Sequence, residues 1–145
     1  MSTSDPVQVQ MILNTFVSGP QAWFFLAQDR GYFAQEGIEI QFTPGDTAAN
    51  AVPKVALGQY DVGYGDFNAL IERVARFGSQ DAIAVYATFT ASPYAVAVPS
   101  DSDIDIPQDL KGKKIAYHPN DAAMLMWPEF ADVADRKSTR LHSSH

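Results

Sequence analysis

The sequence contains no cysteine and only three histidines. The absence of cysteine excludes disulfides, thiolate nucleophiles and cysteine-ligated zinc or iron–sulfur sites. Two of the histidines, His142 and His145, lie in the last few residues, which leaves His118 without a second histidine to complete a catalytic triad or a metal-binding set. We therefore expect no catalytic residues, no metal site and a structural or solvated role for His118.

Long apolar runs and positive charge are also scarce. No stretch reaches the roughly 18 apolar residues that a membrane-spanning helix needs, and the opening "MSTSDPVQVQ" lacks the basic start and apolar core of a secretion signal. Ten Lys and Arg stand against seventeen Asp and Glu, a net charge of −7, which disfavours non-specific binding to nucleic-acid phosphates. As written, the chain is expected neither to enter a membrane, nor to be exported, nor to bind nucleic acid.

What remains is a chain of 145 residues with 46% hydrophobic residues, enough to form a core. Its last eleven residues, "DRKSTRLHSSH" from Asp135 to His145, break off a helical pattern at Ala134 and show no apolar periodicity of their own. They closely resemble a translated sequencing-adapter read; an ordinary basic tail is the alternative. We exclude them from the prediction of the fold.

The rest of the chain alternates between strand-like and helix-like segments. Strands are expected over Val7–Leu13, Ile38–Phe42, residues 60–66 and the apolar run Ala82–Phe89. Helices are expected between them, over Pro20–Arg30, residues 32–37, Thr47–Leu57 and residues 67–78, with Asp46 or Thr47 as the N-cap of the third. Further extended runs are expected over Tyr94–Pro99 and residues 113–119, and a last helix over residues 120–132. This order predicts an α/β lobe with a mainly parallel sheet and helices on both faces.

Polar and small residues gather where the predicted strands end. In an open α/β sheet, ligands bind outside the carboxyl ends of the strands, where backbone N–H groups at helix starts are accessible. The short segments that directly follow the predicted strands contain no Lys or Arg. The candidate ligand-binding residues are Asn14, Thr15, Phe16, Gly45, Asp46, Thr47, Tyr64, Gly65, Asp66, Asn68, Thr90 and Asp121.

Each candidate also has a purely structural interpretation. An aspartate before a helix, as at positions 46, 66 and 121, stabilises that helix by about 1 kcal/mol as an N-cap without any ligand. Gly63 and Gly65 can form a tight turn, and "GYGDFN" lacks the third glycine of a dinucleotide-binding fingerprint, so no nucleotide cofactor is expected. No other cofactor is indicated.

The stretch "FFLAQDRGYFAQEGIEIQFTPGDTAANAVPKVALGQYDVGYGD" and the later "DLKGKKI", Asp109 to Ile115, resemble the sulfonate, nitrate and thiamine-pyrimidine-precursor binding proteins of ABC importers. The resemblance covers Val7 to Ala134. It implies a periplasmic-binding-protein-like (type II) architecture of two α/β lobes. It assigns residues 1–93 to an incomplete first lobe that lacks its returning strand, and residues 94–134 to the crossing strand and the start of the second lobe. The resemblance ends early in the second lobe, which indicates an N-terminal fragment.

The resemblance also implies a function. It is that of a receptor that closes on a small ligand between its lobes and delivers it to a membrane permease, outside the cytoplasm or anchored to the membrane in the full-length protein. If Asp46, Asp66 or Asp121 faces the ligand, an amine or N–H donor is favoured, as in taurine or an aminopyrimidine, and Tyr64, Phe16 or Tyr94 can stack on a ring. Nitrate and other anions stay possible, since backbone N–H groups bind anions.

Two other functional classes remain as alternatives. A pyrimidine-precursor synthase of the same fold uses a cysteine-rich motif, which this sequence lacks. An interaction module would present a large exposed apolar patch.

Overall fold

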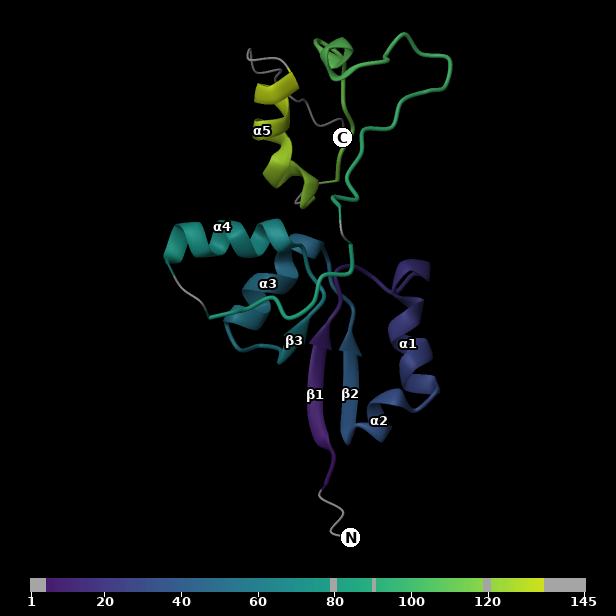
Figure 1. Cartoon of the computed structure of the whole chain (residues 1–145), viewed down its shortest axis with the longest axis vertical. Coiled ribbons are helices and arrows are strands. Elements are labelled where there is room, and N and C mark those ends of the chain that lie inside the picture. Colours follow the sequence, from purple (N-terminus) through teal and green to yellow (C-terminus); the bar gives the residue numbers. More distant parts are fainter. Residues whose placement is uncertain (1–4, 79–80, 90, 119–120, 135–145) are drawn as a thin grey trace. The chain divides into compact units, whose positions relative to one another are not determined.

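The computed structural model describes residues 5–78, 81–89, 91–118 and 121–134 (Figure 1). Thr90 and the tail Asp135–His145 therefore lie outside the described residues. The chain divides into two compact units, Met1–Ala84 and Val85–His145. Among the described residues, no helix has the length and apolar character needed to cross a membrane.

A three-stranded parallel sheet forms the centre of the first unit. The strands are β1 (Val7–Ile12), β2 (Ile38–Thr43) and β3 (Val62–Gly63), in the order β2-β1-β3. β1 pairs with β2 along its whole length, whereas β3 pairs with only the last two residues of β1. The strands expected over Val7–Leu13 and Ile38–Phe42 are confirmed here, because each has a neighbour that satisfies its backbone groups, whereas the strand expected over residues 60–66 is only two residues long.

Helices connect these strands. Between β1 and β2 lie the 3-10 helix η1 (Gly19–Gln21), α1 (Ala22–Asp29) and α2 (Tyr32–Gln35), and α3 (Ala48–Ala56) and α4 (Phe67–Phe77) precede and follow β3. Pro20 occupies the first turn of η1, where its missing N–H costs nothing, and Gly78 ends α4 with a left-handed φ of 60°. Pro53 lies inside α3. In Figure 1, α1 and α2 lie beside β2, and α3 lies beside β3.

The core of the first unit uses both faces of the sheet. Met11, Leu13 and Ile40 are buried against aromatic side chains of α1, α2 and β2. Phe42 is central to this cluster, with its ring centroid 5.0 Å from that of Phe25. Ile12 is also buried, and because side chains alternate along a strand it lies on the opposite face, which α3 covers. The helices therefore sandwich the sheet, as expected for an α/β lobe.

The second unit contains η2 (Pro107–Leu110) and α5 (Ala123–Ala134). Leu110, Ala122 and Ala131 are its buried apolar residues among those described. The remaining described residues of this unit, 85–89, 91–106, 111–118 and 121–122, form turns and irregular backbone.

Three expected strands are wrong within the described residues: Ala82–Phe89, Tyr94–Pro99 and residues 113–118 contain no strand. The first was expected to be buried, yet Ile83 is 73% exposed and Tyr86 is 85% exposed. Apolar, β-branched composition favours a strand only where another strand can pair with its N–H and C=O groups. No described residue outside β1–β3 supplies such a partner.

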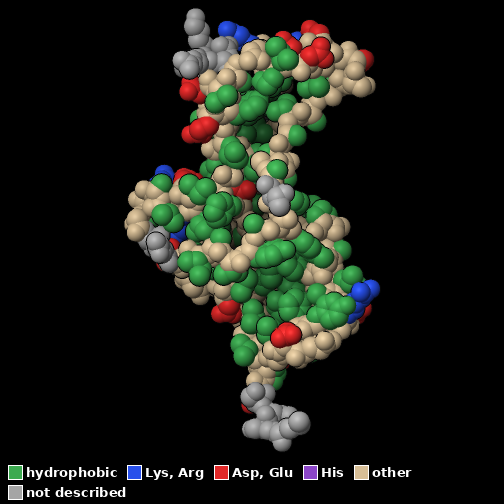
Figure 2. Space-filling view, viewed as in Figure 1, with side chains coloured by type: hydrophobic (Ala, Val, Ile, Leu, Met, Phe, Trp, Pro, Cys, Tyr) green, Lys and Arg blue, Asp and Glu red, His purple; other side chains and the backbone are tan. Residues whose placement is uncertain are grey.

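Many apolar side chains remain on the surface, and Figure 2 shows them spread over the visible face of the molecule. On α4, Phe67, Ile71 and Phe77 are each more than half exposed. The described residues therefore leave much of the apolar face of this helix uncovered.

Candidate functional site

The three loops that follow β1, β2 and β3 meet at one edge of the sheet, because the carboxyl ends of parallel strands lie together. Backbone hydrogen bonds hold these loops in place. Gly45 N–H donates to the Thr15 carbonyl oxygen at 3.0 Å, and Asp66 N–H donates to the Ala48 carbonyl oxygen at 3.0 Å. We call this region the strand-end site. It comprises ten of the twelve candidate residues: Asn14, Thr15, Phe16, Gly45, Asp46, Thr47, Tyr64, Gly65, Asp66 and Asn68.

Two glycines allow the loops to approach so closely. A Cβ at Gly45 would overlap the Leu13 carbonyl oxygen, so only glycine fits there. A Cβ at Gly65 would lie 3.1 Å from the Ala51 Cβ and 3.2 Å from the Ala48 carbonyl oxygen, a tight contact with α3. The glycines therefore set the spacing between the loop after β1, the loop after β2 and the loop after β3.

A buried amide organises the loop after β1. Gln21, which is 2% exposed, accepts hydrogen bonds from the Ser18 backbone N–H and hydroxyl at 3.1 and 2.7 Å. Its amide nitrogen donates to Asn14 Oδ1 at 2.7 Å and to Thr15 Oγ1 at 3.0 Å. Sequence analysis missed Gln21. The available signal was the Ser-x-x-Gln spacing of a capping box at positions 18 and 21.

The two acidic residues of the site are engaged differently. Asp66 is the N-cap of α4, and its carboxylate accepts from Asn68 N–H at 2.8 Å. Asp46 precedes the N-cap of α3, which is Thr47, and is more exposed. The Asn50 amide, which donates to Asp46 at 2.8 Å, lowers the pKa of the Asp46 carboxyl, and Lys54 at 3.5 Å adds a weaker attraction. The oxygens of both carboxylates are hydrogen-bond acceptors and can accept N–H donors from a ligand.

Thr47 carries a buried hydroxyl with no partner. The residue is 9% exposed, and no described residue lies within hydrogen-bond range of its Oγ1. Its side chain makes no capping bond to α3, although the backbone has the extended geometry of an N-cap. A buried hydroxyl without a partner is costly, and because this oxygen is almost fully covered, a ligand group can bond to it only when the residues over it shift.

Of the three rings considered for stacking, Tyr94 belongs to the second unit, and Tyr64 and Phe16 follow β3 and β1 in the first. Tyr64 contacts Phe24 and Trp23 edge-on, with ring centroids 5.3 and 5.9 Å apart, so its ring belongs to the core cluster. Phe16 is 71% exposed at the strand-end site. Of the two, Phe16 is the ring available to stack on a ligand.

The remaining candidates are not brought to this site. Asp121 belongs to the second unit, where its carboxylate accepts from Ala123 N–H at 2.9 Å at the start of α5. That contact matches the capping role considered for it. Thr90 lies outside the described residues. Among the residues that the structure describes, no cluster of His, Asp and Glu could hold a metal ion.

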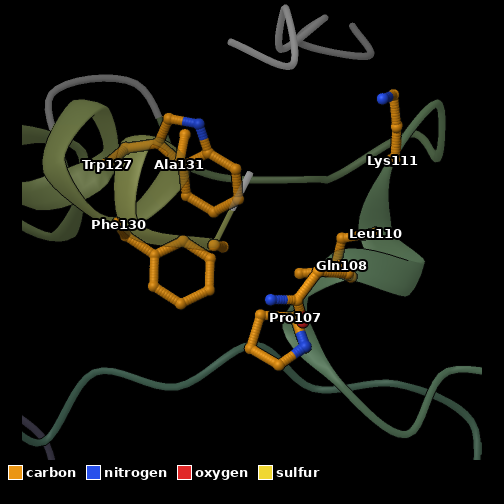
Figure 3. A pocket seen from close by; sticks show the side chains of 8 residues that line it. Pro107, Gln108, Leu110, Lys111, Trp127, Phe130 and Ala131 are labelled. Atoms are coloured by element: carbon orange, nitrogen blue, oxygen red, sulfur yellow. The ribbon is translucent and has the colours of Figure 1, made fainter. Parts of the chain in front are cut away.

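Hollows also occur among the described residues of the second unit, and two are considered in turn. The larger, about 310 Å³, is lined mainly by apolar side chains that include Val96, Ile106 and Phe130. A much smaller one, about 10 Å³, lies where Trp127 and Phe130 of α5 face Pro107 and Leu110 of η2 (Figure 3). The smaller has room for about one water molecule. Neither contains a residue predicted to bind ligand.

Comparison with known families supports the resemblance seen in the sequence. The family model described as NMT1/THI5 like matches residues 20–131, so the chain belongs to the NMT1/THI5-like family. This family includes solute-binding proteins of ABC importers and also synthases. No curated protein and no solved structure gave a match.

Proposed function

We propose that the chain is the ligand-binding first part of a solute-binding receptor of an ABC importer. The observation that carries this proposal is the convergence of three polar loops at the carboxyl edge of a parallel sheet, in a member of a family that contains such receptors. In this proposal residues 1–93 form the first lobe. Residues 94–134 contain the segment Tyr94–Pro99, which crosses between the lobes, and the start of the second lobe. The full-length receptor works outside the cytoplasm and delivers its ligand to a membrane permease.

The proposed ligand is a small polar organic molecule, a taurine-like sulfonate or an aminopyrimidine precursor of thiamine. Two features support this class. Asp46 and Asp66 offer carboxylate acceptors for an amine or N–H group. The first turn of α3 and, once uncovered, the Thr47 hydroxyl, which has no partner among the described residues, offer donors for an oxygen or ring nitrogen. Phe16 offers an exposed ring for stacking. Taurine and the aminopyrimidines each combine a donor group with an acceptor group.

A thermal-shift screen tests the proposal with taurine, ethanesulfonate, nitrate and 4-amino-2-methylpyrimidine as probes. A ligand present at 100 times its dissociation constant stabilises a protein by about 2.7 kcal/mol, which raises the unfolding temperature by several degrees. A shift with taurine or the aminopyrimidine is the expected result. No shift with any probe, from a chain with a cooperative unfolding transition, would contradict the proposal.

The variant Thr47→Val tests whether the Thr47 hydroxyl binds the ligand. Because the Thr47 hydroxyl has no partner in the described chain, its removal breaks no hydrogen bond of the unliganded protein. We expect the unliganded unfolding temperature to stay within about 2 °C, since substitutions that break no contact usually change stability little. The ligand-induced shift should become smaller. An equal shift in both proteins would place the ligand away from α3.

A further inference from the structure

The buried amide of Gln21 sits directly beneath the loop after β1. It makes four hydrogen bonds, two on its oxygen side to Ser18 and two on its nitrogen side to Asn14 and Thr15. All four partners lie within seven residues of Gln21, and the side chain is almost fully buried. The Gln21 amide is therefore held in one position by groups on both sides.

The backbone N–H of Ser18 identifies which atom of the Gln21 amide is the oxygen and which is the nitrogen. Ser18 N–H can only donate, so the Gln21 atom 3.1 Å away from it must be the acceptor, Oε1. The other end is then the amide nitrogen, which can only donate. It lies 2.7 Å from the Asn14 side chain, so Asn14 must offer its oxygen, Oδ1, to Gln21.

This ordering leaves a donor available at the strand-end site. Oδ1 of Asn14 accepts from Gln21, and the two N–H groups of its Nδ2 make no hydrogen bond to a described residue. The Thr15 hydroxyl, by contrast, accepts from Gln21 and donates to the Phe16 carbonyl oxygen at 3.3 Å. Asn14 Nδ2 is thus a side-chain donor of this loop that can meet a ligand.

We infer that Gln21 is a positioning residue that determines ligand specificity, because it turns Asn14 so that the site presents an N–H donor rather than a carbonyl oxygen. This inference rests on the proposed function. It assigns the loop after β1 to the acceptor end of the ligand, a sulfonate oxygen or a ring nitrogen. The N–H donors of the ligand are then left to the carboxylates of Asp46 and Asp66.

A purely structural role for Gln21 makes a different prediction. As the last residue of a capping box, Gln21 would matter only for the stability of the Ser18 turn, and any substitution that weakens this turn would lower affinity in proportion to stability. A positioning role predicts instead that affinity depends on which atom Asn14 presents, whatever the change in stability.

Three variants separate these roles. In Gln21→Glu the carboxylate still accepts from Ser18, but its second oxygen requires a donor, so Asn14 must reverse and present Oδ1 to the site. In Asn14→Asp the Gln21 contacts persist while the outward group becomes an acceptor. Ser18→Ala is the matched control, because it removes one hydrogen bond to the same amide but keeps the backbone N–H that orients it.

The measurement is the affinity of each variant for taurine and for 4-amino-2-methylpyrimidine by isothermal titration calorimetry. For a probe that binds the unsubstituted chain, we expect Gln21→Glu and Asn14→Asp each to weaken binding about tenfold or more, since a ligand acceptor then faces another acceptor. Ser18→Ala should stay within about twofold. In nuclear magnetic resonance spectra, the Asn14 NH₂ protons should move downfield in Gln21→Glu, where they bond to a carboxylate.

Two outcomes overturn the inference in distinguishable ways. If Gln21→Glu and Ser18→Ala weaken binding equally, or the Asn14 NH₂ resonances do not move in Gln21→Glu, Gln21 does not set the orientation of Asn14, and the proposed function is unaffected. If neither probe binds the folded, unsubstituted chain, the proposed function fails and the specificity role fails with it.

Discussion

Gly45 and Leu13 are so close that the Leu13 carbonyl oxygen occupies the place where a Cβ of residue 45 would lie. This contact joins the loop after β2 to the end of β1. Gly45→Ala must therefore push the two loops apart. We expect it to lower the free energy of unfolding by about 1–3 kcal/mol, as overpacking in a rigid environment does. Urea denaturation monitored by circular dichroism measures the change.

Gly19→Ala is the control for this substitution. A Cβ at position 19 meets nothing within 4 Å, and Gly19 does not have the left-handed backbone that favours glycine. Its effect should stay within about 0.5 kcal/mol. Equal effects at positions 19 and 45 would show that the loops move apart freely.

Asp66 allows capping to be separated from ligand binding. Asp66→Ala removes the acceptor for Asn68 N–H and should cost about 1 kcal/mol of stability as well as affinity for an amine-bearing ligand. Asp66→Asn keeps a capping oxygen but loses the charge. We expect it to unfold within about 0.5 kcal/mol of the unsubstituted chain while binding taurine more weakly. Unchanged taurine affinity in both variants would leave Asp66 with the capping role alone.

The second unit should lose stability in acid through Asp109. The backbone N–H groups of Asp105 and Ile106, at 3.0 and 3.1 Å, lower the pKa of the Asp109 carboxyl from its ordinary value of 3.8. The folded chain thus binds this proton less readily than the unfolded chain. The stabilisation is complete above pH 3.8 and disappears as the pH falls through the lower folded value.

Urea unfolding as a function of pH tests this linkage. Between about pH 5 and pH 2, the stability of Asp109→Asn should fall less steeply than that of the unsubstituted chain, because asparagine can still accept a hydrogen bond but does not titrate. Parallel curves would mean that Asp109 contributes nothing to the acid response.

The exposed apolar run makes a contrasting prediction. Ile83→Ala should change the free energy of unfolding by no more than about 0.5 kcal/mol, because the side chain is 73% exposed. Ile12→Ala, at a residue that is 1% exposed, should cost about 2–5 kcal/mol. Denaturation of both variants under one set of conditions checks the pair. A large loss at position 83 would indicate that this run is buried after all, as its composition suggested.

The sequence predicted the first unit well because its elements are determined locally. Alternation defined β1 and β2, and Pro20 and Gly78 marked where helical segments begin and end. The error at Ala82–Phe89 has a different origin. Whether an apolar run becomes a strand depends on a neighbour far away in the chain, and composition contains no information about that neighbour.

The same distinction applies to the candidate site. Loops that follow parallel strands must share an edge, so ten of the twelve candidate residues could be grouped before the structure was known. The unpartnered hydroxyl of Thr47 and the ordering of Asn14 by Gln21 could not be predicted. Both depend on distances between side chains, which a sequence does not encode in any local pattern.

Because β3 is short, the loop that follows it is joined to the sheet by fewer strand pairs than the loop that follows β2. Six residue pairs join β1 to β2, whereas two join β1 to β3. We therefore expect local opening to begin at β3, where the packed Tyr64 ring and the hydrogen bond from Asp66 N–H to the Ala48 carbonyl oxygen must also be released. A ligand that bridges Asp66 and Asn14 would suppress this opening. Hydrogen exchange between the Tyr64 amide and solvent should then be slower with this ligand than without it.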